Sequence, residues 1–388
     1  MVAHTKLLQQ KEIIVLQTKK TNNMITIDKK EFLNGITLGG SMAGKAKTVP
    51  VLEFVKCTLK GNKMMLTSYD TETEVKKRIS VITNEIGDLS FCVSPKELLS
   101  ILRSVSDDVI SFNVDGGVMT IKHKKGELVI PAHNATEFPT PVANQTSQGC
   151  DVSSEMLYNW LKEASMFSSN DEFRAVLCGV HIYMENGEIG VAATDGRRLY
   201  CDKSECEYTG EKISCVVTTK SISAILQAIN GTEKTNITIG DTNIEFKNED
   251  SVVRTRMVEG KYPNYLAIVP TNHTSESKIQ KNELLDSIKR VLIASDNNSN
   301  LVKINAGMCM DLSASDDTFG KKAKETIMCE FSGEALEIGV QGQYLTDCIN
   351  CVHSDNIIIR LIDPTRPILI KDEDDEDKTL VLMPMRIE

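Results

Sequence analysis

The chain has 388 residues and a mass of 42.9 kDa, a length that predicts two or three domains at roughly 100–200 residues each. Hydrophobic residues make up 41% and charged residues 25% of the chain, which excludes a disordered or fibrous protein. The net charge of −10 and the pI near 5.3 argue against a uniformly basic nucleic-acid binder, but not against one whose positive charge is confined to one surface.

The first helix predicted along the chain recurs twice further on. Apolar residues at helical spacing predict helices over 29–38, 153–166 and 281–294. Short apolar runs with Gly-Asn and Asn-Gly turn signals follow, which predict hairpins. Each repeat then has a turn with an aspartate, and Asp70, Asp195 and Asp316 are 125 and 121 residues apart. Since no partner acid, base or metal cluster accompanies them, we interpret them as turn residues that bind local backbone amides.

A second helical pattern and a proline segment complete each repeat. The second helices begin near Lys96 and Lys220, which are 124 residues apart, and the segment 338–352 has a fainter copy of the same pattern. The prolines that follow are separated by 124 and 121 residues, and they are Pro139, Pro263 and Pro384. Equal spacing at both ends of the repeat predicts three copies of one unit of roughly 120 residues.

Two helices and two strand-rich halves per repeat predict an α+β fold with mostly antiparallel sheet. We place the domains at 24–147, 148–270 and 271–388, because polar, turn-rich segments separate them. The leader 1–23 is expected to be disordered, and Met24 is an alternative initiator. No stretch approaches the ~20 apolar residues that span a bilayer, and no signal peptide is recognisable, so the sequence predicts a cytoplasmic protein without a membrane partner.

Candidate chemical motifs are few. Gly39 and Gly44-Lys45 have the spacing of a Walker A loop, but Ala46 stands where Mg²⁺ binding needs Ser or Thr, and the glycines follow a helix. We interpret this segment as an exposed basic loop. Among eleven cysteines, the pair Cys348 and Cys351 lacks further zinc ligands, which favours reduced core thiols and no metal or other cofactor. The acidic run 372–377 lacks calcium-loop spacing and is interpreted as a solvated loop.

Positive charge concentrates on the predicted helices. Basic residues there are Lys29, Lys30, Lys96, Arg103, Lys162, Lys220, Lys281, Lys289 and Arg290, whereas acidic residues gather in strands and loops. Ordinary amphipathic helices also carry lysines on the solvent face, so this pattern leaves two interpretations open. If the helices of all three repeats face one way, they present a basic lining on an acidic protein.

Several motifs resemble one known family. The threefold repeat, the segment 193–199 (Ala-Thr-Asp-Gly-Arg-Arg-Leu), the segment 261–265 (Lys-Tyr-Pro-Asn-Tyr) and the C-terminal 381–387 (Val-Leu-Met-Pro-Met-Arg-Ile) are together similar to the bacterial DNA polymerase III beta subunit, the sliding clamp. The resemblance covers residues 24–388. It implies a non-catalytic processivity factor for DNA replication: a head-to-tail homodimeric ring of six domains, with helices lining the hole and sheets outside.

The resemblance also implies partners and contact residues. The expected partners are encircled double-stranded DNA, bound without sequence specificity, a second copy of the chain, a clamp loader, the replicative polymerase alpha subunit, other polymerases, ligase and mismatch-repair proteins; such a protein associates with the nucleoid. Partner peptides are expected in a groove formed by Leu177, Thr194, Gly196, Arg197, Arg198, Leu199, Pro263, Ile268, Gln341, Tyr344, Val381, Leu382, Met383, Pro384, Met385 and Arg386. DNA-facing positions carried over are Lys45, Lys47, Lys96, Arg103, Arg174 and Lys220, and those of the dimer interface are Leu128, Ile130, Leu292 and Ile293.

The chain departs from the family at the leader, at Ala267 on one wall of the groove, where relatives often have a basic residue, and in the density of the acidic run. Two other hypotheses stay open at this point. One is a repeat-built, nucleotide-dependent enzyme that uses the glycine loop, and the other is a monomeric scaffold that binds peptides but not DNA.

Overall fold

The computed structural model describes residues 24–46, 49–83, 87–142 and 144–387. The leader 1–23 and Lys47 lie outside the described residues. The chain divides into two compact units: unit 1 contains residues up to 142 together with 246–255, and unit 2 contains 144–245 together with 256–387.

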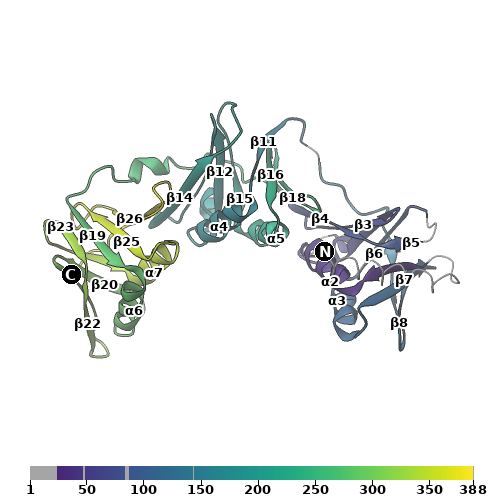
Figure 1. Ribbon diagram of the computed structural model, residues 1–388, viewed down its shortest axis with the longest axis horizontal. Coiled ribbons are helices and arrows are strands. Elements are labelled where there is room, and N and C mark those ends of the chain that lie inside the picture. The colour runs from purple at the N-terminus through teal and green to yellow at the C-terminus, as the bar shows by residue number, and fades with distance from the viewer. Residues whose placement is uncertain (1–23, 47–48, 84–86, 143, 388) are drawn as a thin grey trace, which may run out of the picture. The chain divides into compact units, whose positions relative to one another are not determined.

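The described residues of unit 1 form two α-helices and strands of two antiparallel sheets (Figure 1). The five-stranded sheet has the order β5 (Ile82–Thr83), β1 (Ile25–Asp28), β7 (Val109–Asp115), β8 (Val118–His123), β9 (Gly126–Pro131). The other has β10 (His133–Asn134), β6 (Leu89–Val93), β2 (Val55–Lys60), β3 (Lys63–Tyr69), β4 (Thr73–Ser80) and β18 (Ser251–Arg256) in that order. Helices α2 (Lys29–Gly39) and α3 (Pro95–Ser104) pack together, and a short turn, η1 (Pro50–Glu53), precedes β2.

Unit 2 contains four longer helices in two packed pairs, α4 (Ser154–Ser165) with α5 (Thr219–Ile229) and α6 (Lys281–Leu292) with α7 (Gly342–Asn350). Figure 1 shows them on one side of the unit, with strands on the other. A nine-stranded sheet has the order β15 (Ile213–Thr218), β12 (Gly179–Glu185), β13 (Glu188–Thr194), β14 (Arg198–Glu205), β27 (Thr379–Leu382), β26 (Ile368–Asp372), β25 (Asn356–Leu361), β19 (Ser275–Gln280), β23 (Glu330–Gly333).

The remaining strands of unit 2 complete the repeats. A four-stranded sheet has the order β22 (Lys321–Met328), β21 (Cys309–Asp316), β20 (Leu301–Ala306), β24 (Leu336–Gln341). Strand β11 (Ser147–Ser153) pairs antiparallel with β16 (Lys234–Gly240), and β17 (Asn243–Lys247) follows β16. Two short helices are η2 (Glu172–Leu177) and η3 (Tyr265–Ile268). The predicted α+β class with antiparallel sheets is confirmed.

Most helices begin directly after a strand, and a polar side chain at the junction sets the start. The side chains of Asp28, Ser94, Ser153, Gln280 and Gln341 each accept a hydrogen bond from the backbone N–H three residues on. Such capping satisfies one of the free amides at a helix start. The fold therefore needs no loop between strand and helix, which keeps each repeat short.

The three repeated aspartates behave as predicted. Asp70 Oδ1 accepts hydrogen bonds from the backbone amides of Glu72 and Thr73, at 3.1 and 2.7 Å. The equivalent oxygen of Asp195 accepts from residues 197 and 198, and that of Asp316 accepts from residue 319. The acid is thus part of the repeated turn, as the sequence interpretation held.

Two other sequence interpretations change. The acidic run is not wholly solvated: Asp372 ends β26, is 4% exposed, and accepts a hydrogen bond from the backbone N–H of His353 at 2.6 Å. Nor are all basic helix residues free, because Lys29 and Lys281 donate to the backbone carbonyls of Val105 and Val352. These two lysines occupy equivalent positions at the starts of α2 and α6, so their ammonium groups satisfy carbonyls just beyond the neighbouring helix.

The repeat predicts a stabilising substitution. Thr71 has φ +79°, and the residue 125 positions later in the equivalent turn is Gly196, with φ +88°. A β-branched residue is strained in the left-handed region, whereas glycine is not. Thr71→Gly should raise the free energy of unfolding of unit 1 by up to about 1 kcal/mol, after the entropy of glycine in the unfolded chain is allowed for. Urea denaturation measures this free energy of unfolding. The control is Thr136→Gly, at an exposed threonine, and it should lower the free energy of unfolding or leave it unchanged.

Candidate functional site

The most elaborate site in unit 2 forms where β14 meets β27, two strands that are almost 180 residues apart in sequence. Their register pairs Arg198 with Leu382 and Leu199 with Val381. Beyond β27, the backbone N–H of Met383 donates to the carbonyl of Arg197 at 2.8 Å, and that of Met385 donates to Gly339 at 2.7 Å. The C-terminal Met-Pro-Met segment is therefore held by the loop before β14 on one side and by β24 on the other. We call this region the β14–β27 site.

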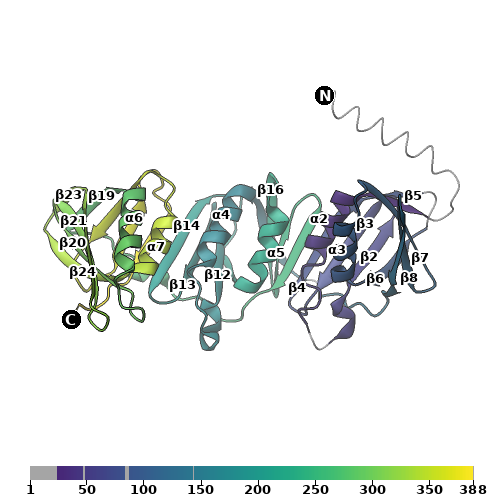
Figure 2. The same cartoon turned by 90° about the horizontal axis from the view of Figure 1, so that it is seen from below.

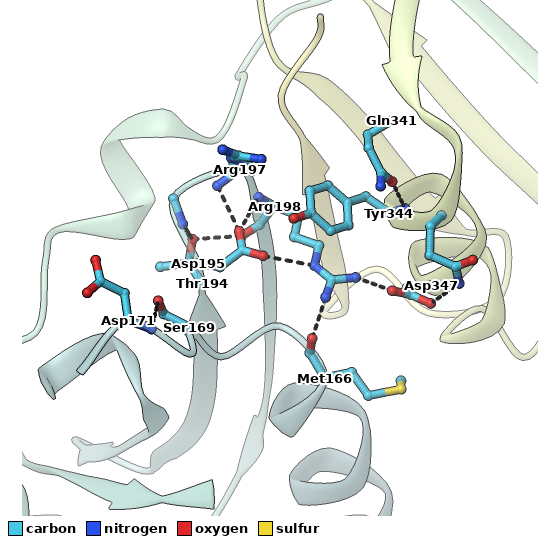
Figure 3. Close-up of polar contacts among 12 residues, drawn as sticks. Met166, Ser169, Asp171, Thr194, Asp195, Arg197, Arg198, Gln341, Tyr344 and Asp347 are labelled. Atoms are coloured by element: carbon cyan, nitrogen blue, oxygen red, sulfur yellow. Dashed lines mark hydrogen bonds and ion pairs between the residues drawn. The ribbon is translucent and has the colours of Figure 1, made fainter. Parts of the chain in front are cut away.

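The loop 194–198 is ordered by its own side chains (Figure 3). Asp195 Oδ1 accepts from the backbone amides of Arg197 and Arg198, at 2.8 and 3.0 Å. Thr194 Oγ1 donates to the carbonyl of Arg198 at 2.6 Å and accepts from the amide of Gly196 at 3.0 Å. These bonds leave the Arg197 side chain exposed and turn that of Arg198 inward, as Figure 3 shows.

Arg198 joins three elements of the site. Its Nε donates to Asp195 at 3.2 Å, its Nη2 donates to the carbonyl of Met166 at 2.6 Å, and its Nη1 forms an ion pair with Asp347 on α7. The guanidinium also lies 4.4 Å from the centre of the Tyr344 ring. The side chain is only 9% exposed. An arginine in this position fixes α4, the loop 194–198 and α7 relative to one another, since its planar donors have defined directions.

An apolar cluster forms the floor of the site. Leu177, Leu199 and Val381 are at most 8% exposed and pack with Tyr262, whose hydroxyl accepts a hydrogen bond from the amide of Thr194 at 3.1 Å. Leu382 is also fully buried. These expected groove residues therefore support the surface rather than form it.

Other expected groove residues remain accessible. Ile268 is 43% exposed and Met383 is 37% exposed. The remaining accessible or half-buried members are Gly196, Arg197, Pro263, Gln341, Tyr344, Pro384, Met385 and Arg386. Gln341 has a structural task as well, since its side chain accepts from the amide of Tyr344 at 2.6 Å and begins α7. An apolar surface with methionines at its rim can adapt to different apolar side chains.

Arg174 lies beside this site. Its Nε donates to Asp171 at 2.9 Å, and a Cβ built on Gly196 would lie 3.3 Å from its Nη1. Because Gly196 also has a positive φ, this position favours glycine for both conformation and space. The sequence placed Arg174 among the DNA-facing residues, and the structure places it at the edge of the loop 194–198.

Sequence reasoning missed two contributors, Asp347 and Met166. Asp347 lies on α7, where no motif marks it as the partner of an arginine 149 positions earlier. Met166 contributes a backbone carbonyl just beyond α4, and a carbonyl carries no sequence signal. The Asp347 contact becomes visible only when the two repeats of unit 2 pack together, and the Met166 contact only when β14 lies beside the end of α4.

A buried polar network lies behind the site. Glu163 on α4 is 7% exposed and contacts His353 at 2.8 Å, Lys378 at 3.2 Å and the Tyr200 hydroxyl at 3.0 Å. Tyr200 also contacts Asp202 at 3.2 Å. Burial, with a smaller effect of Asp375, raises the pKa of Asp202 to about 6. Glu163, through His353 and Lys378, therefore connects the second repeat to the third by charge, in addition to the strand pairing.

The other expected residues fall on both units. In unit 1, Lys96 and Arg103 are exposed on α3, and Lys45 lies in the loop after α2. In unit 2, Lys220 is exposed on α5. Of the expected interface residues, Ile130 is 7% exposed on edge strand β9 and Leu128 is half-buried, whereas Ile293 after α6 is 76% exposed and Leu292 is half-buried.

Cysteine and metal chemistry give no second site within the described ranges. All eleven cysteines are free, and Cys348 and Cys351 are buried in and just after α7. Burial raises the pKa of the Cys351 thiol to about 12, so it stays protonated at neutral pH. Among residues 24–387, apart from those the structure does not describe, no group of three His, Cys, Asp or Glu side chains could hold a metal ion. No helix in the same ranges is long and apolar enough to cross a membrane.

The Asp202 pKa predicts a pH-dependent stability. A carboxyl whose pKa rises from 3.8 to about 6 on folding favours the folded state below pH 4, and that contribution is lost as pH rises through 6. The free energy of unfolding of Asp202→Asn, relative to that of wild type, should therefore rise by about 1–3 kcal/mol between pH 4 and pH 7. Urea unfolding monitored by Trp160, the single tryptophan, reports on this region. The exposed control Asp317→Asn should show no such trend, and an Asp202→Asn difference independent of pH would contradict the pKa.

Comparison with known proteins identifies the family. Three family models match in order: the DNA polymerase III beta subunit N-terminal domain over 23–142, the central domain over 151–264 and the C-terminal domain over 266–386. The beta sliding clamp of Rickettsia felis is 25% identical, over 94% of this chain and 99% of that protein, and that of Bacillus subtilis is 22% identical, over 93% and 99%. The Pseudomonas aeruginosa DNA polymerase III subunit beta has a similar structure, with TM-score 0.87, 21% identity and coverage of 94% and 100%. The chain therefore belongs to the DNA polymerase III beta subunit family, the beta sliding clamps that act as processivity factors in DNA replication.

Proposed function

We propose that this chain forms a head-to-tail homodimeric ring around duplex DNA and tethers partner proteins through peptides bound at the β14–β27 site. The ring itself is non-catalytic. Its place of action is the cytoplasm, on nucleoid DNA. The observation that carries the proposal is the β14–β27 site, where the accessible Met383 and Met385 lie next to an apolar floor in a chain of this family.

Peptide binding fits the chemistry of this site. Its floor is built from buried side chains and therefore does not collapse when the site is empty. Its rim contains thioether side chains, which repack against different apolar anchors. One site of this kind can serve a clamp loader, the replicative polymerase alpha subunit, other polymerases, ligase and mismatch-repair proteins in turn.

The proposed DNA contact is electrostatic and unspecific. Lys96, Arg103 and Lys220 are exposed at helix surfaces, and among the described residues none has an acidic partner within ion-pair distance. Exposed cations attract phosphates without reading bases, and that attraction weakens as salt rises. A closed ring needs only such weak contacts, because its topology prevents escape.

Ring closure is proposed between two edge strands, β9 of one copy and β22 of the next. Val129 on β9 is 56% exposed, although its neighbour Ile130 faces the core, and Ile293 offers an exposed apolar side chain near α6. Unpaired edge strands have free backbone donors and acceptors that a second copy can satisfy. A head-to-tail contact that closes after two copies gives a discrete oligomer of about 86 kDa.

The alternative of a nucleotide-dependent enzyme has no support from the glycine loop. Gly39 ends α2 and Gly44 follows it in a turn with φ +76°, whereas a phosphate-binding loop leads from a strand into a helix. The peptide-binding monomer is distinguished from a ring by its mass in solution.

Truncating the methionine rim should weaken partner peptides. Met383→Ala with Met385→Ala should reduce affinity for a fluorescent Gln-Leu-x-Leu-Phe peptide by about 1–2 kcal/mol per side chain, because each loses apolar contact area. Fluorescence anisotropy measures the affinity, and light scattering should show an unchanged dimer mass. Met308→Ala, at an 87% exposed methionine between β20 and β21, is the control. Wild-type affinity in the double variant would place the peptide elsewhere.

Retention on DNA tests the ring. Once loaded on circular DNA, the clamp should resist salt that removes it from linear duplex, since leaving a circle requires opening an apolar interface that salt does not screen. Changing Lys96, Arg103 and Lys220 to alanine should reduce loading, whereas changing the exposed Lys122, Lys234 and Lys247 should have little effect. The measurement is retention before and after cutting the circle with a restriction enzyme. If cutting changes nothing at raised salt, direct affinity holds the protein on DNA and the ring proposal fails.

A further inference from the structure

One face of a unit 1 sheet carries a concentration of positive charge that the proposed function does not use. Strands β2, β3 and β4 lie side by side, with α2 and α3 against one face (Figure 2). Leu66 and Ile79 point toward α2, where both lie within about 3 Å of a Cβ built on Gly35. The opposite face carries Lys56, Lys60, Lys63, Lys76 and Arg78, which we call the basic face.

Strand register brings these cations together. Lys56 lies opposite Thr67, which lies opposite Lys76, and Lys60 lies opposite Lys63. Directly opposed residues on one face have Cβ atoms about 5 Å apart, so like charges here repel one another. The basic face lines a hollow of about 420 Å³ that is bounded by Met65 and by the segment 138–140, Phe-Pro-Thr.

Local acids neutralise only part of this charge. Glu74, 3% exposed at the base of the hollow, forms an ion pair with Lys76 at 2.8 Å and lies 3.9 Å from Arg254. Arg78 pairs with Asp250 at 2.9 Å. Lys60 and Lys63 have no acidic partner among the described residues, and Lys56 contacts the ring of Phe138 at 5.6 Å.

The repeat shows that the fold does not require these lysines. In unit 2, the residues 125 positions later have the same register, with Glu185 opposite Glu188 where unit 1 has Lys60 opposite Lys63. His181 corresponds to Lys56 and lines an equivalent hollow of about 630 Å³ beside Tyr262 and Pro263. Two copies of one scaffold thus carry opposite charge at this pair of positions. The fold therefore does not require positive charge at the positions of Lys60 and Lys63.

We propose that the basic face is a second docking surface, which binds an acidic, extended peptide segment of a partner protein. Carboxylates of the peptide would pair with Lys56, Lys60 and Lys63, and an apolar side chain between them would enter the hollow against Met65 and Pro139. Single-stranded nucleic acid fits less well, because it needs exposed aromatic rings for base stacking. The one aromatic residue in the lining, Phe138, is 6% exposed. This inference stands whether or not the chain forms a ring.

The test uses the full chain and a fluorescent hexapeptide, Asp-Glu-Leu-Glu-Asp-Glu. Wild type should bind it at low salt and bind roughly tenfold more weakly at physiological ionic strength. Lys60→Glu with Lys63→Glu installs the residues found at the equivalent unit 2 positions, so the variant should fold, and circular dichroism checks this. Its affinity for the peptide should fall at least about tenfold at low salt.

The matched control is Lys234→Glu with Lys247→Glu, two exposed lysines whose replacement changes net charge by the same amount. It should bind the hexapeptide within about twofold of wild type. The inference is overturned if wild type does not bind the peptide, or if both double variants lose affinity equally. It is also overturned if an oligo-dT binds the basic face more tightly than the peptide and Lys60→Glu with Lys63→Glu abolishes that binding, since the ligand would then be nucleic acid.

Discussion

The pairing of β14 with β27 is the contact on which the rest of unit 2 depends. It joins the second repeat to the third within one nine-stranded sheet. Without it, the loop before β14 would have no partner for the Arg197 carbonyl, and the Met-Pro-Met segment would keep only its bond to Gly339 on β24. Backbone pairing of this kind leaves little freedom of register, because a shift by one residue would turn buried Leu199 and Val381 toward the opposite face.

Charged groups reinforce this junction at a cost. Arg198 and Asp347 form one cross-repeat pair, and Glu163 with Lys378 forms another that is almost fully buried. Removing such charged groups from water costs free energy. The ion pairs offset this cost because further hydrogen bonds, to backbone carbonyls and a tyrosine hydroxyl, satisfy their remaining donors and acceptors. In return, these pairs fix the orientation of the second repeat relative to the third. Apolar contacts alone would tolerate small rotations between the repeats, whereas directional hydrogen bonds do not.

Comparing the repeats distinguishes the positions that the fold requires from the surface positions that can vary. Most inward-facing positions are apolar in each copy, and the turn aspartates at 70, 195 and 316 each accept a hydrogen bond from the backbone amide three residues on. Outward-facing positions diverge, and the change from lysine at 60 and 63 to glutamate at 185 and 188 reverses the charge at this pair of equivalent positions. A β-sheet allows this because neighbouring residues point to opposite sides, so that one face can vary while the other remains a core.

The sequence by itself determined the α+β class, the threefold repeat and the function of the turn aspartates, since these follow from local periodicity and from spacings within one repeat. The motifs at 193–199 and 381–387 also marked the family, and both lie in the β14–β27 site. Tertiary structure alone decided which motif residues are reachable: Leu199 and Leu382 are fully buried, whereas Met383 is exposed. It alone gave Arg198 its partners just beyond α4 and on α7, and it revealed that Asp372 and Ile130 are buried. Burial and long-range pairing depend on segments that are distant in the chain, and a single sequence without its folded neighbours carries no local signal for them.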